Sequence, residues 1–295
     1  MCELFNCKII QYANGTVEVR QYDRVINNHL LYMSEDEISE HQKLGKERAK
    51  DDICEPEEVY NPFSEKVEPI IEFEQLDLLE LRARRSINNS LKRTVNEIYK
   101  YSRQCKWSYF ITLTFSKEKA DRYNFTSCVQ LANKWFGNQR MRYANDLQYL
   151  LVPELHKDGA WHFHGVIAQE DKMVFTDSGL KYKSKTIYNL SGWKYGFSTA
   201  TKVDDTSKVS SYITKYITKE LCQITKGKKR YYRSRNIPEP IETNYLLEND
   251  EKDSSVRMVI DGLGADCEYS KQVNGYVNVS YTYYKVKELE GSGAK

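Results

Sequence analysis

The residues best suited to chemistry are three histidines within nine positions, His156, His162 and His164. The run His162-Phe163-His164 fits a β-strand, whose side chains alternate between faces, so both imidazoles would share one face. Two imidazoles on one face can ligate a single metal ion. Such a pair is also a common surface feature of strands, so it does not by itself establish a metal site.

Glu154 joins the two histidines if the chain turns back at Lys157-Asp158-Gly159. A three-residue loop with Gly159 in the left-handed conformation would pair Glu154 with His162. A two- or four-residue loop would pair Glu154 with Phe163 instead. Two imidazoles and a carboxylate with open coordination positions are typical of a catalytic metal, and this set suits Mg²⁺ or Mn²⁺ acting on phosphate.

A second group of reactive side chains comes from a tandem repeat of Tyr-Ile-Thr-Lys. On a helix, Tyr212 and Tyr216 would share a face, and so would Lys215 and Lys219. A phenol has a pKa near ~10, so it needs nearby positive charge or a polarised target to act as a nucleophile. The competing interpretation is an amphipathic helix whose isoleucines pack in the core while the tyrosines and lysines reach solvent.

The elements that would position these groups alternate between the strand and helix periods. Their order predicts an α+β fold with a central antiparallel sheet flanked by helices. Expected helices cover residues 75–104, 126–147 and 206–222, and expected strands cover 107–115, 149–167 as a pair, 194–203, 255–260 and 275–284.

The sequence patterns near both ends of the chain predict segments that are separate from the domain with the reactive residues. Residues 8–22 read as a hairpin around Asn14-Gly15, a dipeptide typical of type I′ turns. Residues 34–70 read as an acidic loop or linker. The sequence therefore divides into residues 1–75 (hairpin and linker), 76–240 (the chemical domain) and 241–295 (β-rich extension and flexible tail).

Charge is strongly segregated although the net charge is only +2. Residues 35–80 hold 16 acidic and five basic side chains. Residues 82–142 hold 14 basic and three acidic ones, and residues 194–235 hold 11 basic and three acidic ones. This pattern favours a polyanion-binding body next to an acidic segment, with clustered solvated faces as the alternative.

Several classes of protein are excluded or disfavoured by composition. A mean hydropathy of −0.70 and the lack of a long apolar run argue against a membrane protein. The first residues lack the pattern of a secretory signal. The seven cysteines form no CxxC pair, so we expect a reduced, cytoplasmic protein without a zinc knuckle or a disulfide framework.

Together these motifs resemble those of HUH-superfamily rolling-circle replication initiators, in particular the replication-associated proteins of single-stranded DNA phages and related plasmids. Three motifs occur in the family's order, and two further runs support them. The motifs are Phe110-Ile111-Thr112-Leu113-Thr114, then Pro153-Glu154 with His162-Phe163-His164-Gly165, then Tyr212 to Lys219; the supporting runs are Trp193 with Tyr195-Gly196-Phe197, and Ser234-Arg235-Asn236-Ile237-Pro238.

The resemblance implies a site-specific endonuclease and ligase of single-stranded DNA, with a central HUH strand and the tyrosine helix packed across it. His162, His164 and Glu154 would ligate Mg²⁺ or Mn²⁺. Tyr216, or else Tyr212, would attack the scissile phosphate and leave a 5′-phosphotyrosine link and a free 3′-OH.

The resemblance also assigns supporting roles. Lys215 or Lys219 would neutralise charge at the phosphate. We expect the hydroxyls of Thr112 and Thr114 to bond to backbone or to the tyrosine helix. His156 lies outside the motif and is expected near the metal ligands or on the surface.

The expected partners are single-stranded or hairpin origin DNA in the cytoplasm of a bacterial host. A basic run offers contacts for the DNA backbone, with a solvated loop as the alternative. Its chosen residues are Lys228, Lys229, Arg230 and Arg233. The sequence has no P-loop motif, so host helicase and polymerase would have to be recruited.

Three other functions remain open from the sequence. A mobilisation relaxase or single-strand transposase would use the same chemistry. A non-catalytic origin-binding protein could share the fold, although the complete HUH motif and both tyrosines argue against it. A zinc hydrolase is disfavoured because the sequence has no HExxH motif.

Overall fold

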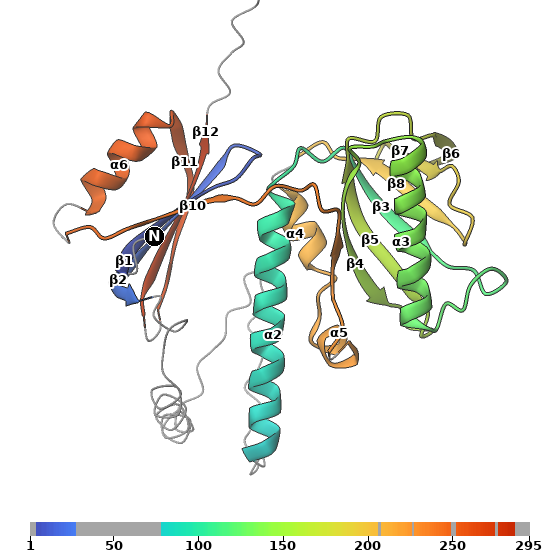
Figure 1. Ribbon diagram of the computed structural model, residues 1–295, viewed down its shortest axis with the longest axis horizontal. Helices are drawn as coiled ribbons and strands as arrows, with labels where there is room; N and C mark the ends of the chain where they lie inside the picture. Colours follow the sequence, from blue (N-terminus) through green and yellow to red (C-terminus); the bar gives the residue numbers. More distant parts are fainter. Residues whose placement is uncertain are drawn as a thin grey trace, which may run out of the picture. The chain divides into compact units, whose positions relative to one another are not determined.

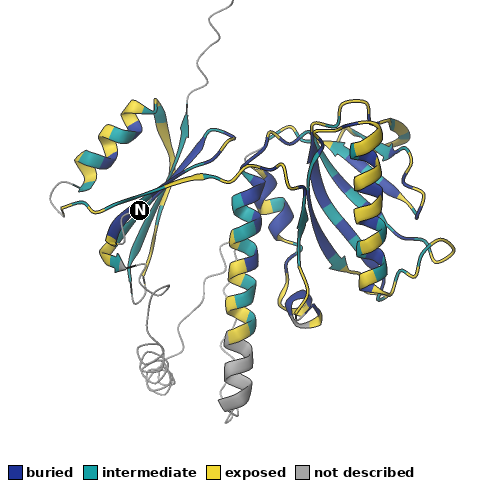
Figure 2. Cartoon of the chain, in the orientation of Figure 1, coloured by how far each residue is buried: buried dark blue, intermediate teal, exposed yellow. Residues whose placement is uncertain are grey.

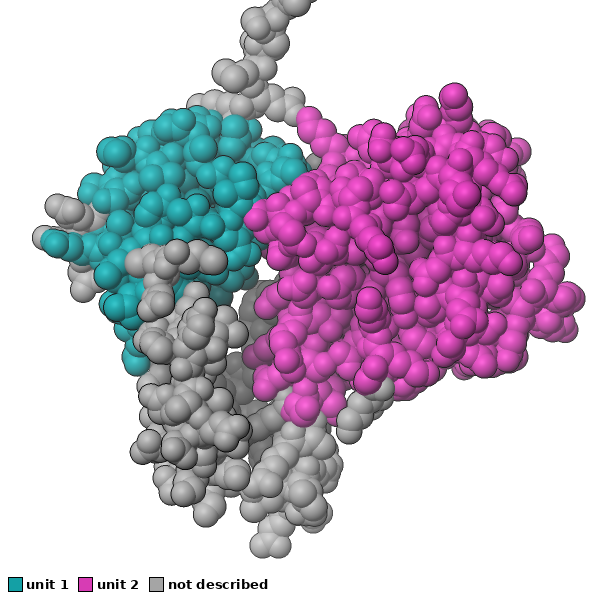
Figure 3. Space-filling view, in the orientation of Figure 1, with its two compact units in different colours: residues 1–75, 241–295 teal, residues 76–240 magenta. Residues whose placement is uncertain are grey.

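The structure is a computed structural model, which describes residues 4–27, 78–205, 208–225, 227–248, 252–274 and 277–286. The chain forms two compact units (Figures 1 and 3). One comprises residues 76–240, and the other combines residues 1–75 with 241–295. The expected acidic linker and C-terminal tail lie outside the described residues. Among the described helices, none is both long and apolar enough to cross a membrane.

The 76–240 unit is built on a seven-stranded antiparallel sheet with the strand order β6-β7-β8-β3-β5-β4-β9. This architecture confirms the predicted fold class. Its strands are β3 (Tyr109–Thr114), β4 (Gln148–Leu155), β5 (Trp161–Ala168), β6 (Phe175–Tyr182), β7 (Lys185–Leu190), β8 (Ser198–Lys202) and β9 (Tyr232–Arg233). Its helices are α2 (Leu78–Ser102), α3 (Phe125–Arg142), α4 (Val209–Thr214) and α5 (Lys219–Ile224).

Helices cover both faces of this sheet (Figure 1). On one face, Phe136 of α3 stacks on Tyr149 of β4, with ring centroids 4.1 Å apart. On the opposite face, Tyr212 of α4 packs on Phe110 of β3 at 4.3 Å. Most strand residues that point toward α3 are buried, among them Ile111, Leu113 and Phe163 (Figure 2).

Gly165 lets the central strands approach closely. A Cβ at this position would lie 2.5 Å from both the Leu150 carbonyl oxygen and the Leu151 side chain. The backbone oxygen cannot move without breaking the β4–β5 ladder, so only glycine fits here.

The β4–β5 hairpin confirms the three-residue loop predicted from the sequence. Gly159 has a φ of +82°, and the His156 amide donates to the Ala160 carbonyl at 2.9 Å. Glu154 therefore pairs with His162, and Val152 pairs with His164.

The second unit is a five-stranded antiparallel sheet with the order β10-β1-β2-β12-β11. Val256 and Ile260 of its helix pack on a small buried cluster from β1 and β2. The sequence treated the N-terminal and C-terminal segments as separate, but β2 pairs directly with β12. The elements are β1 (Leu4–Gln11), β2 (Thr16–Asn27), β10 (Ile241–Tyr245), α6 (Lys252–Gly262), β11 (Ala265–Val273) and β12 (Val279–Val286).

Two local predictions in this unit are wrong. The strand expected over residues 255–260 is part of α6, because Val256 and Ile260 are spaced for one helical face. The β1–β2 turn is not type I′. Gly15 has a φ of +82°, its amide donates to the Tyr12 carbonyl, and the loop holds three residues with only the glycine in the left-handed region.

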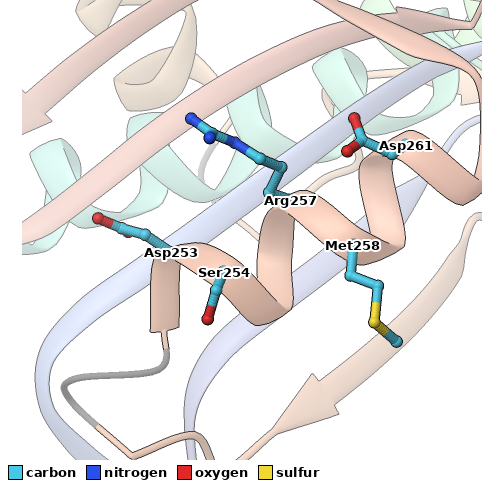
Figure 4. A pocket seen from close by; sticks show the side chains of 5 residues that line it. All are labelled: Asp253, Ser254, Arg257, Met258 and Asp261. Atoms are coloured by element: carbon cyan, nitrogen blue, oxygen red, sulfur yellow. The ribbon is translucent and has the colours of Figure 1, made fainter.

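The solvent face of α6 carries a shallow hollow, shown in Figure 4. Its lining comes from α6 alone and includes none of the side chains that the sequence assigned to chemistry. The residues are Asp253, Ser254, Arg257, Met258 and Asp261.

Candidate active site

Three neighbouring strands bring the predicted ligands to one face of the larger sheet. Thr114 of β3 pairs with His162 of β5, which pairs on its other side with Glu154 of β4. Two residues along the strands, Thr112 pairs with His164 in the same way. Because directly paired residues project from the same face, these five side chains lie together opposite the α3 core.

The two threonines hold the imidazole rings. Thr112 Oγ1 lies 3.2 Å from His164 Nδ1, and Thr114 Oγ1 lies 3.4 Å from His162 Nδ1. The hydroxyls were expected to bond to backbone or to the tyrosine helix, so the prediction named the wrong partners. The reason is the register, which sets each threonine directly beside a histidine. Bonds at Nδ1 direct ligand chemistry to Nε2 of each ring.

His164 and Glu154 are in direct contact. The distance from His164 Nε2 to Glu154 Oε2 is 2.6 Å. Burial lowers the pKa of His164, although Glu154 opposes this shift. Burial is also the main cause of the lowered pKa of His162, and the nearby His156 adds to it. Both shifts favour the neutral imidazole, which is the form that binds metals.

The three predicted ligands suit a divalent cation in donor type and in the sheet face that they share. Within the described residues, however, no three His, Cys, Asp or Glu side chains converge closely enough to hold a metal ion as they stand. The Glu154 side chain contacts His164, whereas the His162 ring stacks on His156 with ring centroids 5.0 Å apart. His156 is therefore an exposed neighbour of the site.

The tyrosine segment is not the single helix expected over residues 206–222. Helix α4 ends at Thr214, and two tighter turns follow, with Tyr216 N–H donating to Ile213 O at 3.3 Å. The side chain of Thr218 then accepts the Leu221 amide at 3.1 Å and caps the new helix α5. A threonine that caps the next helix competes with continuation of the first one, which explains the break.

Both tyrosines nevertheless reach the histidine face. The Tyr216 ring stacks on His164 with centroids 3.7 Å apart and planes 2° apart. Its hydroxyl donates to the Tyr212 hydroxyl at 3.0 Å. Burial, followed by the bond to Tyr212, raises the pKa of Tyr216. The free phenol therefore stays protonated at neutral pH.

Lys215 is the cation next to this pair. Its Nζ lies 4.1 Å from the Tyr212 ring centre and 4.8 Å from that of Tyr216. Burial lowers the pKa of Lys215, and Glu154 opposes the shift. Lys219 is exposed like Lys215, but it lies at the first position of α5. The two lysines, which the sequence treated alike, thus differ in position.

The four residues chosen for DNA binding also divide into two kinds. Lys228 and Lys229 are exposed. The Arg230 guanidinium instead donates to Thr225 Oγ1 at 3.1 Å and to the Cys222 carbonyl at 3.0 Å.

Arg233 is held in a similar way. Its guanidinium lies 3.9 Å from the Tyr101 ring centre and donates to Glu239 at 3.1 Å. Both arginines therefore bind the protein's own groups.

The fold and the site are consistent with the HUH class: paired histidines lie on a central strand, and tyrosines from α4 and the turns after it pack on the same face. A comparison with protein-family models matches residues 108–221 to the family of replication-associated proteins of the ORF2 and gene-2-protein type. This segment runs from β3 to α5 and includes the histidines and both tyrosines. The match supports a Rep-like replication initiator, as the motifs predicted.

The HUH assignment is consistent with this match, which also supports a role in the initiation of replication. The search of curated proteins and the search of solved structures found no match.

Proposed function

We propose that this protein nicks single-stranded origin DNA by tyrosine transesterification and later rejoins the strands. The observation that carries the proposal is the stacking of Tyr216 on His164, which itself pairs with Glu154. A phenol, an imidazole and a carboxylate thus lie together on one face of the sheet, which supports the proposal.

Tyr216 is the proposed nucleophile. Its hydroxyl oxygen attacks the scissile phosphorus, a bond from phosphorus to the tyrosine oxygen forms, and the bond from phosphorus to the 3′ oxygen breaks. The phenol loses its proton and the 3′ oxygen gains one, so the products are a 5′-phosphotyrosine and a free 3′-OH. The reverse reaction by a 3′-OH rejoins DNA and restores the tyrosine.

The surrounding groups have distinct proposed roles. Glu154, His162 and His164 would hold Mg²⁺ or Mn²⁺, which supplies Lewis-acid polarisation of the phosphate when bound. Lys215 would stabilise the phenolate that Tyr216 forms in the attack; its Nζ, 4.8 Å from the centre of that ring, supports this role. Tyr212, hydrogen-bonded to Tyr216, is available for a second transfer.

The wider proposal concerns partners. Exposed Lys228 and Lys229 would contact the phosphates of origin DNA. Host helicase and polymerase in the bacterial cytoplasm are the proposed protein partners.

The test uses single-stranded DNA that carries the origin of the protein's own replicon, with Mn²⁺, followed by a denaturing gel. We expect a covalent protein–DNA adduct that Tyr216→Phe greatly reduces while DNA binding stays near normal. Tyr212→Phe should permit the first cleavage and impair the second transfer. The exposed Tyr182 on β6 offers the matched control, Tyr182→Phe, which should behave as wild type. An adduct that persists in the Tyr212→Phe/Tyr216→Phe double variant would refute the mechanism.

A further inference from the structure

Phe197 is an exposed aromatic residue on the same face as the candidate active site. Its side chain is 52% exposed. The Thr114 amide donates to the Phe197 carbonyl at 2.9 Å, and the β3–β8 register continues from the pair Leu113–Ser198 to set Phe197 beside Thr114. Thr114 pairs with His162 on its other side, so Phe197, which directly precedes β8, forms one row with Thr114 and His162.

The segment before Phe197 is fixed to the end of β3. The Ser116 amide donates to the Tyr195 carbonyl at 2.9 Å, and the Trp193 indole N–H donates to the Thr114 carbonyl at 3.0 Å. At Gly196, a Cβ would collide with the Thr114 carbonyl oxygen. Phe197 is thus held in place by a rigid scaffold while its ring remains accessible.

The exposure of this ring contrasts with the other aromatic rings near β3. Phe115 and Phe163 are fully buried and pack on one another, with centroids 5.9 Å apart. No aromatic ring in the described part of the chain stacks on Phe197. An isolated exposed apolar residue is ordinary on a protein surface. This one, however, ends the row that begins at the metal-ligand candidates.

We propose that Phe197 is a stacking platform for an unpaired DNA base beside the scissile phosphate. This inference rests on the proposed nicking function and adds how the site selects its substrate. Two strand spacings, about 10 Å, separate Phe197 from His162, so the ring lies close to the proposed metal ligands. An aromatic face accepts any unpaired base but is closed to a base within a duplex, so it selects single strands.

The first experiment measures binding of a short fluorescein-labelled oligodeoxyadenylate by anisotropy, in chelator so that no cleavage occurs. We expect Phe197→Ala to weaken binding about 5- to 150-fold, the range that corresponds to loss of one stacked base. Phe197→Trp should retain binding. The control Tyr182→Ala removes another exposed aromatic residue, on edge strand β6 of the same sheet, and should stay within about twofold of wild type. Equal binding by wild type and Phe197→Ala would overturn the proposal, and so would an equal loss in Tyr182→Ala.

The second experiment places a fluorophore at the site. All four native tryptophans, at positions 107, 135, 161 and 193, are buried. The indole introduced by Phe197→Trp should therefore dominate quenching by acrylamide. Bound oligodeoxyadenylate should protect it. Saturating DNA that leaves the quenching unchanged would overturn the proposal even if the alanine variant is unstable.

These measurements separate the inference from the proposed function. If the wild-type protein forms the covalent adduct but Phe197 shows no contact with DNA, only the stacking role fails. If the introduced indole is protected but no adduct forms, the nicking function fails and Phe197 remains a base-stacking residue.

Discussion

The bond between Thr112 and His164 leads to a specific prediction about metal dependence. When His164 Nε2 serves as a ligand, Nδ1 carries the proton and donates it to Thr112 Oγ1, 3.2 Å away. Thr112→Val keeps the shape and the strand preference of the residue but removes this acceptor. The imidazole then loses both its orientation and a partner for a half-buried N–H.

The expected increase in the Mn²⁺ concentration for half-saturation follows from these two losses. A neutral hydrogen bond contributes about 0.5–1.5 kcal/mol, and an unsatisfied buried donor costs about 1–3 kcal/mol. At about 1.4 kcal/mol per factor of ten, half-saturation by Mn²⁺ should need about 10- to 100-fold more metal. The Thr114 bond is longer, at 3.4 Å, so Thr114→Val should shift the midpoint less, by roughly threefold.

The assay is adduct formation as a function of Mn²⁺ concentration, with DNA affinity measured separately in chelator. Thr199 provides a matched control, because it pairs with Thr112 from the β8 side of the same face. Thr199→Val should leave the Mn²⁺ midpoint unchanged. Identical midpoints for wild type and Thr112→Val, or an equal shift in Thr199→Val, would refute the positioning role. DNA affinity serves as the control for folding, because a general loss of structure would lower it. We expect Thr112→Val to leave DNA affinity unchanged.

Three further outcomes test other parts of the structure. Lys228→Ala with Lys229→Ala should weaken DNA binding and reduce its dependence on salt. Arg230→Ala should lower the urea midpoint more than this double variant does, because its guanidinium binds Thr225 and Cys222, whereas Lys228 lies over the Phe125 ring only; an unchanged midpoint in Arg230→Ala would contradict this prediction. Gly165→Ala should lower the free energy of unfolding in urea by about 1–3 kcal/mol or more, because the added methyl group meets a backbone oxygen. An unfolding curve identical to that of wild type would show that β4 and β5 can separate to accommodate the methyl group. Burial raises the pKa of Cys105 and of Cys128 to about 12, so both remain thiols at pH 8 and should resist iodoacetamide. The exposed Cys267 should react. Peptide mapping that finds all three cysteines modified equally in the folded protein would contradict the burial of Cys105 and Cys128.

Local patterns allowed much of the candidate site to be predicted from the sequence. Glycine at position 159 favours a three-residue loop, and that loop alone fixes Glu154 opposite His162. The same alternation that places both histidines on one face also places Thr112 and Thr114 there. The presence of two threonines in an otherwise apolar strand was the available indication that β3 supplies hydrogen-bond partners for the histidines.

Other features could not be predicted, because they depend on competition between local structures or on contacts between distant parts of the chain. The repeat of Tyr-Ile-Thr-Lys has helical spacing throughout, but Thr218 stabilises a new helix start more than it supports the old one. The pairing of β2 with β12 joins segments more than 250 residues apart, as in Gln21 with Ser280, and no local pattern encodes it. Arg230 and Lys229 are neighbours in one basic run, and only tertiary contacts show that the arginine binds the protein itself.

The covalent link between Tyr216 and DNA is the central claim, and the chain offers a direct way to locate it. Trypsin cleaves after Lys208, Lys215 and Lys219, so Tyr212 falls in the peptide 209–215 and Tyr216 in the peptide 216–219. Wild-type protein is incubated with origin single-stranded DNA and Mn²⁺, digested with nuclease and trypsin, and sequenced by fragmentation mass spectrometry. We predict a nucleotide linked through phosphate to Tyr216. A nucleotide on Tyr212 alone would contradict the assignment of the nucleophile, and a nucleotide on neither tyrosine would contradict the mechanism.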